Sequence, residues 1–253
     1  MQQKADTRPP HQQIAAEIRA AILSGDAALG SQLETTQQLM ARFGVTNQTI
    51  QRALKVLKAE GFVVGRAGSG VYVRARAQQI ITPASYARPA APGEPYPWVT
   101  EARRRGQRGG SRLLEVGEVK PPVQVAAALG LAENGVAVLR HQVMLLDDEP
   151  AELAWSYYPV EIARGTPLAE SRRIRGGAPA YLAERGLRPE ETVDHVSVRL
   201  PTTGEFVGLE LPDDVPVLRT FRVVLAAGRR PIEVSVLVKA GYAYELEYRI
   251  TSD

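Results

Sequence analysis

The sequence predicts an α+β protein of two domains. Its 253 residues are more than one compact module needs, and a proline-rich stretch separates a helix-rich beginning from a strand-rich remainder. No apolar run approaches the ~18 residues that a membrane span requires. Cysteine is absent, which excludes disulfides, thiolate nucleophiles and cysteine-ligated metal sites. The polar segment after Met1 contains no apolar core, so we expect no secretory signal and a cytoplasmic protein.

Three helices are predicted before residue 62. The first has isoleucine at every fourth position and stops at Gly25. The second begins with a capping box formed by Thr35 and Gln38 and ends at Gly44. The third follows Thr46 and has an apolar stripe opposite its polar residues, with a spacing of about 100° per residue. These are the stripe residues of the first and third helices: Ile14, Ile18, Ile22, Ile50, Ala53, Leu54 and Leu57.

Two short β-rich runs around a glycine-rich tip, FVVGRAGSGVYV at residues 62–73, predict a hairpin after the third helix. Three helices followed by a hairpin make a winged helix-turn-helix. Positive charge is concentrated in the same part of the chain. Residues 1–79 carry ten Lys and Arg against five Asp and Glu, a net charge of +5, and the remainder carries −2. This asymmetry predicts a polyanionic partner for the first domain.

The second domain is predicted to hold a mostly antiparallel sheet. Residues 74–97 contain five prolines and no sustained period, so the expected division is a first domain at 1–75, a linker at 76–97 and a second domain at 98–253. The runs 136–146 and 151–160 are joined by the acidic turn DDEP and predict a hairpin. Further strands are expected at 191–201, 215–226, 230–239 and 244–250, and helices at 121–131 and 178–187.

The N-terminal motifs QIAAEIRAAILSGDAALGSQL and LETTQQLMARFGVTNQTIQRALKVLKAEGFVVGRAGSGVYV resemble the DNA-binding domain of the GntR family of bacterial transcription regulators. The motifs ALGLAENGVAVLRHQVMLLDDEPAELAWSYYP, AYLAERGL and GRRPIEVSVLVKAGYAYELEYRI resemble the UTRA effector-binding domain of the HutC subfamily. The fold of that domain is shared with chorismate lyase. The resemblance implies a homodimer that binds double-stranded operator DNA and is released from it by a small-molecule effector.

The resemblance implies three DNA-facing positions at which family members commonly carry arginine. In this sequence those positions are Gln37, Asn47 and Gln51. Asn and Gln side chains can pair with adenine N6 and N7, whereas Arg most often pairs with guanine. We therefore expect adenine recognition, with phosphate contacts from the basic side chains and close approach of the wing backbone. The expected DNA-binding residues are Thr35, Gln37, Thr46, Asn47, Gln48, Thr49, Gln51, Arg52, Lys55, Arg66, Ala67 and Gly68.

The resemblance also implies an effector pocket. Family members that bind sugar phosphates carry an R-x-R pair at the positions of Arg140 and Gln142, and charged or hydroxyl groups at those of Ala154 and Ala178. Most of these groups are absent here, so we expect a flatter or more apolar effector, carrying a carboxylate. The expected effector-binding residues are Arg140, Gln142, Trp155, Ser156, Tyr158, Tyr242 and Tyr244. In the alternative interpretation, the aromatic residues are core and Arg140 is an ordinary ion-pair partner.

The sequence thus predicts a ligand-responsive transcriptional regulator, and repression is the expected mode because operator occupancy alone excludes polymerase. No metal, cofactor or membrane partner is expected. A lyase-type enzyme remains the alternative, suggested by the chorismate lyase-like fold, although fold does not imply function. The arginine-rich runs at 101–112 and 170–176 are interpreted as solvated surface, with auxiliary nucleic-acid contact as the alternative.

Overall fold

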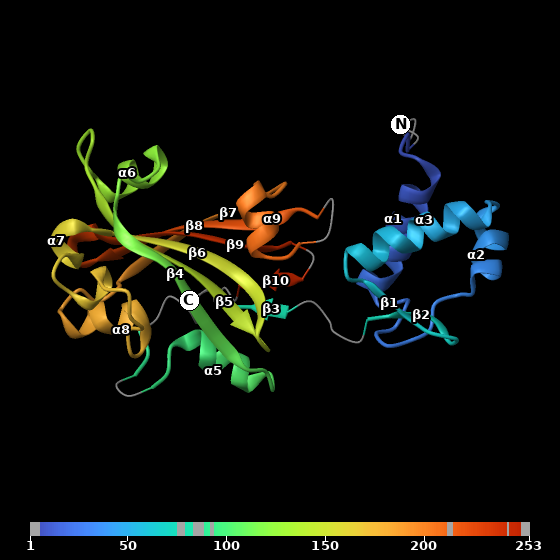
Figure 1. Cartoon of the computed structure of the whole chain (residues 1–253), viewed down its shortest axis with the longest axis horizontal. Coiled ribbons are helices and arrows are strands. Elements are labelled where there is room, and N and C mark those ends of the chain that lie inside the picture. The colour runs from blue at the N-terminus through green and yellow to red at the C-terminus, as the bar shows by residue number, and fades with distance from the viewer. Residues whose placement is uncertain are drawn as a thin grey trace, which may run out of the picture. The chain divides into compact units, whose positions relative to one another are not determined.

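The computed structural model describes residues 6–74, 79–82, 89–91, 94–211, 215–241 and 243–248. The chain divides into two compact units (Figure 1). The main division falls between Gln79 and Ile80, and Val215 is also grouped with the first unit. Within these described ranges, no helix is both long and apolar enough to cross a membrane.

The first unit consists of three helices and a hairpin, as the sequence predicts. Its helices are α1 (Pro10–Ser24), α2 (Thr36–Phe43) and α3 (Asn47–Ala59), and its strands are β1 (Val63–Arg66) and β2 (Gly70–Val73). The two strands pair antiparallel, with Val63 opposite Val73 and Arg66 opposite Gly70. The chain before α2 adds to this wing, because the Leu33 N–H donates to the Val71 carbonyl over 2.8 Å.

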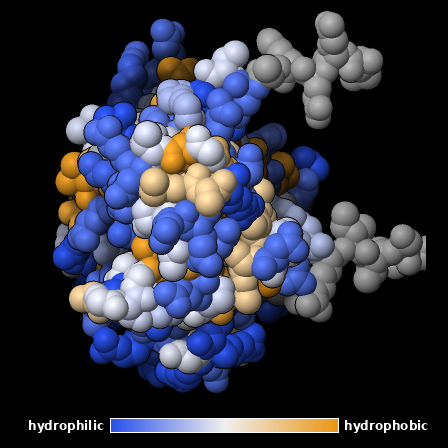
Figure 2. All heavy atoms as spheres, turned by 90° about the vertical axis from the view of Figure 1, so that its right-hand side faces the viewer, coloured by the Kyte–Doolittle hydropathy of each residue, from blue (hydrophilic) through white to orange (hydrophobic). Residues whose placement is uncertain are grey.

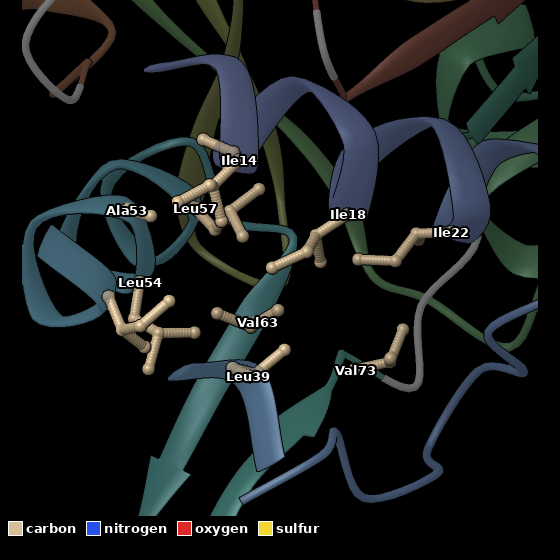
Figure 3. Packing of buried hydrophobic residues seen from close by; sticks show 11 residues of the cluster. Ile14, Ile18, Ile22, Leu39, Ala53, Leu54, Leu57, Val63 and Val73 are labelled. Atoms are coloured by element: carbon tan, nitrogen blue, oxygen red, sulfur yellow. The ribbon is translucent and has the colours of Figure 1, made fainter. Parts of the chain in front are cut away.

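The apolar stripes of the three helices meet in one core. Ile14, Ile18 and Ile22 of α1 point toward residues of α2, α3 and the wing (Figure 3). The isoleucine spacing of four residues puts all three side chains on one side of α1, and each is at most 8% exposed. The core thereby fixes which side of α3 remains exposed to solvent.

The helix caps follow the sequence prediction in part. Thr35 and Gln38 form the expected capping box at the start of α2, and the Thr35 N–H donates to Gln38 Oε1 over 2.8 Å. Thr46 is the N-cap residue of α3, but its hydroxyl does not accept from the helix backbone. Thr46 Oγ1 instead lies 3.2 Å from Thr49 Oγ1.

The second unit is built on a six-stranded antiparallel sheet with the strand order β4-β5-β6-β9-β8-β7. The strands are β4 (Gly109–Val119), β5 (Ala137–Leu146), β6 (Glu149–Pro159), β7 (Glu191–Arg199), β8 (Val217–Ala226) and β9 (Arg230–Ala240). The expected hairpin is confirmed: β5 and β6 are joined by Asp147 and Asp148, both with positive φ. A separate two-stranded sheet joins β3 (Gln79–Ile81) to β10 (Tyr244–Leu246).

Helices cover both faces of the large sheet (Figure 1). α6 and α9 pack on one face, and α5 and α8 lie on the other. The helical segments are α5 (Pro97–Arg104), α6 (Val123–Leu129), α7 (Val160–Ala163), η1 (Pro167–Ala169), α8 (Gly177–Glu184), α9 (Thr203–Gly208) and η2 (Ala227–Arg229). α6 and α8 fall within the two helices expected from the sequence, apart from the first residue of α8.

Several elements differ from the sequence expectation. β4 was not expected, because a register shift between Leu113 and Glu115 breaks the alternation of apolar and polar residues that identifies a strand. The arginine-rich run at 101–112 therefore belongs to the end of α5 and the start of β4. β3 lies inside the expected linker, and the expected strand at 244–250 is described only as the three residues of β10, outside the large sheet. The domain boundaries given above remain predictions.

Candidate functional site

Helix α3 exposes amide and basic side chains on the side away from the core. Its buried residues follow the apolar stripe, so the intervening positions face solvent. The exposed residues are Asn47, Gln48, Gln51, Arg52 and Lys55. Gln51 is oriented by α2, since its Nε2 donates to Thr36 Oγ1 over 3.4 Å. Thr35 and Gln37, at the start of α2, are also exposed. The first turns of α2 and α3 thus both expose polar side chains to solvent.

The wing has a defined tip. The Arg66 guanidinium lies over the Tyr72 ring, 4.1 Å from its centroid, and Tyr72 Oη lies 2.6 Å from Ser69 Oγ. Gln32 Nε2 donates to the Ser69 carbonyl over 2.8 Å. Gly70 has a φ of 109°, a conformation that L side chains rarely adopt, so the turn depends on glycine there. Ala67 and Gly68 are exposed at this tip.

Some basic side chains of the first unit form ion pairs with carboxylates, and others do not. Arg42 forms an ion pair with Glu34, and Arg19 forms one with Glu60. Within the described part of the chain, Arg52, Lys55 and Arg66 have no carboxylate partner. The face of the molecule in Figure 2 is mostly hydrophilic, with scattered hydrophobic residues. Unpaired cations beside exposed amides can contact phosphates while the amides contact base edges.

The second unit contains a cavity of about 470 Å³ on one face of the large sheet. α5, the start of α8 and the β3/β10 pair contribute to its walls. Its apolar lining includes Ile81, Tyr96, Trp98, Met144, Leu182 and Leu246. A volume in this range is typical of small-molecule sites.

A row of polar side chains crosses the cavity floor on five adjacent strands. The row follows directly from strand register, because cross-strand partners point to the same face. In strand order from β5 to β7, its members are Arg140, Ser156, Ser235, Arg222 and Asp194. All five line the cavity.

Two buried ion pairs lie on the same floor. Arg222 donates from Nε and from one terminal nitrogen to the two oxygens of Asp194, each over 2.7 Å. Lys239 forms a second pair with Glu152, in which the Lys239 side chain is 4% exposed. Burial would lower the pKa of the Arg222 guanidinium, but hydrogen bonding to Asp194 and the negative charges of Asp194 and Glu152 together outweigh it and raise that pKa. These four charges are therefore neutralised within the protein.

A hydroxyl network surrounds the third carboxyl of the floor. Ser156 Oγ lies 2.7 Å from Ser235 Oγ, and Ser235 donates to Glu233 Oε1 over 2.6 Å. Burial raises the pKa of the Glu233 carboxyl, opposed by hydrogen bonds from Ser235, Tyr158 and Ser156 and by the charge of Arg222. Burial and the nearby Glu233 charge raise the pKa of Tyr158 well above its usual range.

Arg140 is held by backbone carbonyls. One terminal nitrogen lies within 3.1 Å of the carbonyl oxygens of Pro167, Leu168 and Glu170, and the other donates to the Arg172 carbonyl over 2.8 Å. Burial lowers the pKa of this guanidinium. Arg140 therefore fixes the loop that leads to α8.

The rim of the cavity near α8 is basic. Arg173 and Arg175 are exposed, line the cavity, and have no ion-pair partner within the described ranges. α8 begins at Gly177, where a Cβ would overlap the Tyr96 ring. The close contact between that ring and the glycine brings the helix start, with its partial positive charge, to the cavity wall.

Comparison with known proteins assigns both units. Residues 10–73 match the family of bacterial regulatory proteins described as gntR, and residues 104–245 match the UTRA domain, which covers more than half of the chain. The chain belongs to the GntR family of regulators with a UTRA domain. An HTH-type transcriptional regulator of Streptomyces coelicolor is 25% identical over 97% of this chain and 95% of its own length. The regulator GgaR of Escherichia coli is 25% identical over 92% of this chain and 87% of its own.

The fold agrees with that assignment. The crystal structure of PhnF from Mycobacterium smegmatis superposes with a TM-score of 0.60 at 20% identity, covering 95% of this chain and 100% of that one. The fold has the winged helix-turn-helix and antiparallel-sheet parts that the sequence predicted. By its family, the chain is a DNA-binding transcriptional regulator with an effector domain.

The structure brings together four of the seven expected effector-binding residues of this UTRA domain. Arg140, Gln142, Ser156 and Tyr158 line the cavity. Trp155 does not, because neighbouring residues of a strand point to opposite faces; it stacks on His141 at 4.4 Å between ring centroids. Tyr244 is buried with Trp98 and Ile81 rather than lining the cavity. The expected Tyr242 lies outside the described residues.

The sequence analysis missed most of the polar and charged groups on the UTRA cavity floor. These residues are Glu152, Asp194, Arg222, Glu233, Ser235 and Lys239. Each lies in a run correctly predicted to be a strand, with polar residues on the face that a buried strand should fill with apolar ones. That mismatch is the signal that could have identified them.

Proposed function

We propose that this regulator is a repressor that occupies operator DNA as a homodimer and releases it when a small molecule binds the cavity. One observation carries the proposal: the chain that exposes the amide-rich side of α3 also contains a cavity of about 470 Å³ with an unpaired basic rim. Occupying an operator excludes polymerase without a further contact, which favours repression over activation. The expected location is the cytoplasm, where its DNA target lies.

The proposed DNA contacts are the exposed amides of α3 and the unpaired cations around them. Asn47, Gln48 and Gln51 would contact base edges, since residues at the start of a recognition helix enter the major groove. Arg52 and Lys55 would contact phosphates, with Arg66 doing so from the wing. The residues proposed to support them are Thr35, Gln37, Thr46, Thr49, Ala67 and Gly68.

The proposed effector has an apolar, flat body and a carboxylate. Trp98, Met144 and Leu246 offer apolar surface, and Arg173 and Arg175 at the rim can attract the anion. A phosphate is disfavoured because Gln142 and Ala154 occupy positions where phosphate-binding members of the family carry charged groups. Arg140 is a weak candidate for the anion, since its two terminal nitrogens already donate to carbonyls.

Dimerisation through the second unit is also proposed. Two winged helices must be spaced to meet the half-sites of a pseudo-palindromic operator, and a two-fold dimer provides that spacing. Sedimentation of the full chain checks this: a dimer is expected at micromolar concentration. A monomer that still binds a two-half-site operator with a single-site isotherm would contradict it.

The β3/β10 pair is the proposed route from cavity to DNA. Ile81 of β3 and Leu246 of β10 line the cavity, and the Glu247 N–H donates to the Ile81 carbonyl over 2.9 Å. Only residues 75–78 separate Arg74, just after the wing, from Gln79 at the start of β3. A ligand that displaces Ile81 would therefore act on the segment leading directly to the DNA-binding unit.

A gel shift with the full chain and DNA upstream of its own gene tests the proposed function. Binding at low salt, and release by a compound that also raises the melting temperature, are the expected results. Failure to bind any nearby promoter fragment at low salt would instead favour the lyase-type alternative.

A further inference from the structure

The two edge strands of the large sheet, β4 and β7, differ in regularity. β4 is interrupted by the register shift between Leu113 and Glu115, and such a shift bends an edge away from further pairing. β7 pairs with β8 along its whole length without a shift. Within the described ranges, no backbone hydrogen bond joins the outer side of β7 to another segment. β7 therefore presents a regular row of unpaired N–H and C=O groups.

The middle of β7 is exposed on both of its faces. His195, Val196, Ser197 and Val198 are all exposed, although neighbouring strand residues point to opposite sides. Val196 lies on the cavity face, because it is opposite Thr220 of β8, which lines the cavity. Val196 is 40% exposed and Val198, on the same face, is 65% exposed. Two exposed valines on a regular edge are typical of a strand that pairs with another chain.

The sequence of β7 is complementary to itself. A two-fold axis at the edge would pair β7 antiparallel with the same strand of a second copy, with one residue on the axis. With Ser197 on the axis, Val196 lies beside Val198 of the partner subunit, and this contact occurs twice. With Val196 on the axis, Val198 would instead lie beside a carboxylate, Asp194 of the partner subunit. Contact between the valines therefore selects Ser197.

We propose that β7 is the dimer interface, and that two copies pair antiparallel about Ser197 to join their large sheets into one. This inference rests on the proposed dimerisation through the second unit and names its surface. The axis is perpendicular to the sheet, so both cavities lie on the same face of the joined sheet. β7 also carries Asp194, the last member of the polar row on the cavity floor, so the partner subunit adjoins each floor.

A single cysteine on the axis tests the register. The chain has no cysteine, so Ser197→Cys gives one thiol per copy, and it changes one atom of an exposed side chain. Directly opposed strand residues have Cα atoms about 4.5 to 5.5 Å apart, a separation that a disulfide can join. Oxidation of the full chain with copper phenanthroline should therefore convert most of it into a covalent dimer on a non-reducing gel.

His195→Cys is the matched control. His195 is exposed on the same strand and the same face as Ser197. In the proposed register, the two copies of this position are about 13 Å apart along the paired strands, which is too far for a disulfide. The oxidised His195→Cys protein should therefore run as a monomer on the same gel.

Charged substitutions test the contact between the valines. Val198→Lys places an ammonium group beside Val196 of the partner subunit, and should raise the dimer dissociation constant about tenfold. Adding Val196→Glu to this variant places opposite charges beside each other at both contacts, and should recover most of the loss. Val207→Lys is the control, because Val207 lies on α9 outside the sheet and is 67% exposed. It should dimerise as the wild type does. Sedimentation of the full chains measures all three.

The two possible failures are distinguishable. A wild-type monomer at micromolar concentration contradicts the proposed dimerisation, and the proposed interface falls with it. A wild-type dimer overturns only the β7 interface if Ser197→Cys forms no disulfide, if His195→Cys forms one equally well, or if Val198→Lys leaves the dissociation constant unchanged. Dimerisation would then occur through another surface of the second unit.

Discussion

Ser156 Oγ lies 2.7 Å from Ser235 Oγ, although the two serines are 79 residues apart in the chain. They meet because β6 and β9 are neighbours in the large sheet and pair these residues in register. Arg140 continues the row on the β5 side and Arg222 on the β8 side. The hydroxyls direct their protons toward Glu233, so the electrostatics of the cavity floor depend on that carboxyl.

Glu233→Gln is expected to change how stability depends on pH. Burial raises the pKa of the Glu233 carboxyl, so the folded protein retains this proton at a pH where the unfolded chain has lost it. The stabilisation is complete below the unfolded pKa and is lost as pH rises through the folded pKa. As pH rises above the unfolded pKa of a Glu carboxyl, about 4.3, the wild type should therefore lose stability relative to the variant. Urea unfolding midpoints measure this difference, and parallel pH profiles would contradict it.

Asp194→Ala is expected to destabilise the second unit by about 3 to 5 kcal/mol, because it leaves the buried Arg222 guanidinium without its carboxylate. Urea unfolding monitored by Trp98 and Trp155, both in this unit, measures the change. The matched control is Glu118→Ala, which removes a carboxylate from the exposed pair with Arg164 and should have no resolvable effect. Equal losses in the free energy of unfolding from the two changes would show that burial does not determine how much each ion pair contributes.

Local patterns were sufficient to predict the first unit. The isoleucine spacing of α1 and the Thr35–Gln38 box depend on residues within one turn or one helix of each other, and the structure has both. The strands of the second unit were likewise predicted, apart from β3 and β4, because most alternate over enough residues. In β4, the register shift after Leu113 removes the alternation that would have revealed it.

The cavity floor could not be predicted in the same way, because its residues meet only through strand order. Asp194 and Arg222 are 28 residues apart, and Glu152 and Lys239 are 87 apart. No local pattern specifies that β9 inserts between β6 and β8. The error over Trp155 was avoidable from the sequence. Trp155 and Ser156 are neighbours on β6, and adjacent strand residues face opposite sides of a sheet, so the two could not both line the cavity.

Ile81→Ala is expected to weaken the link between cavity and DNA while leaving the cavity able to bind. Ile81 is 4% exposed, lines the cavity and lies on the strand that follows the DNA-binding unit. A compound that stabilises the wild type should still raise the melting temperature of the variant, but its effect on operator affinity should fall severalfold. The coupling is obtained from operator dissociation constants with and without the compound.

Leu139→Ala is the control for the Ile81 change. It removes a comparable aliphatic side chain from the core on the face of the large sheet opposite the cavity. Its coupling should match that of the wild type. If both variants lose coupling equally, the effect comes from general loosening of the unit, and the route through β3 and β10 is refuted.

Gln51→Ala is expected to cost about 1 to 3 kcal/mol on the preferred operator and to relax preference at one base pair, because a Gln amide can donate to and accept from adenine together. Gln51 also donates to Thr36 Oγ1, so its loss could loosen the contact between α2 and α3. Gln48→Ala is the second variant, since Gln48 is exposed on the same helix and no contact to α2 is described for it. Binding titrations against operators changed one pair at a time measure both.

Lys55→Ala should weaken binding to all sequences about equally, because an exposed, unpaired lysine on α3 can contact phosphate but not fix a base. With few free cations on the helix, the salt dependence should correspond to about four to eight phosphate contacts per dimer. Arg42→Ala is the control, since Arg42 is held by Glu34 and should change affinity less.

If Gln48→Ala and Gln51→Ala leave every base preference unchanged, α3 is not the recognition surface. Sequence would then be sensed by the wing or through the shape of the DNA.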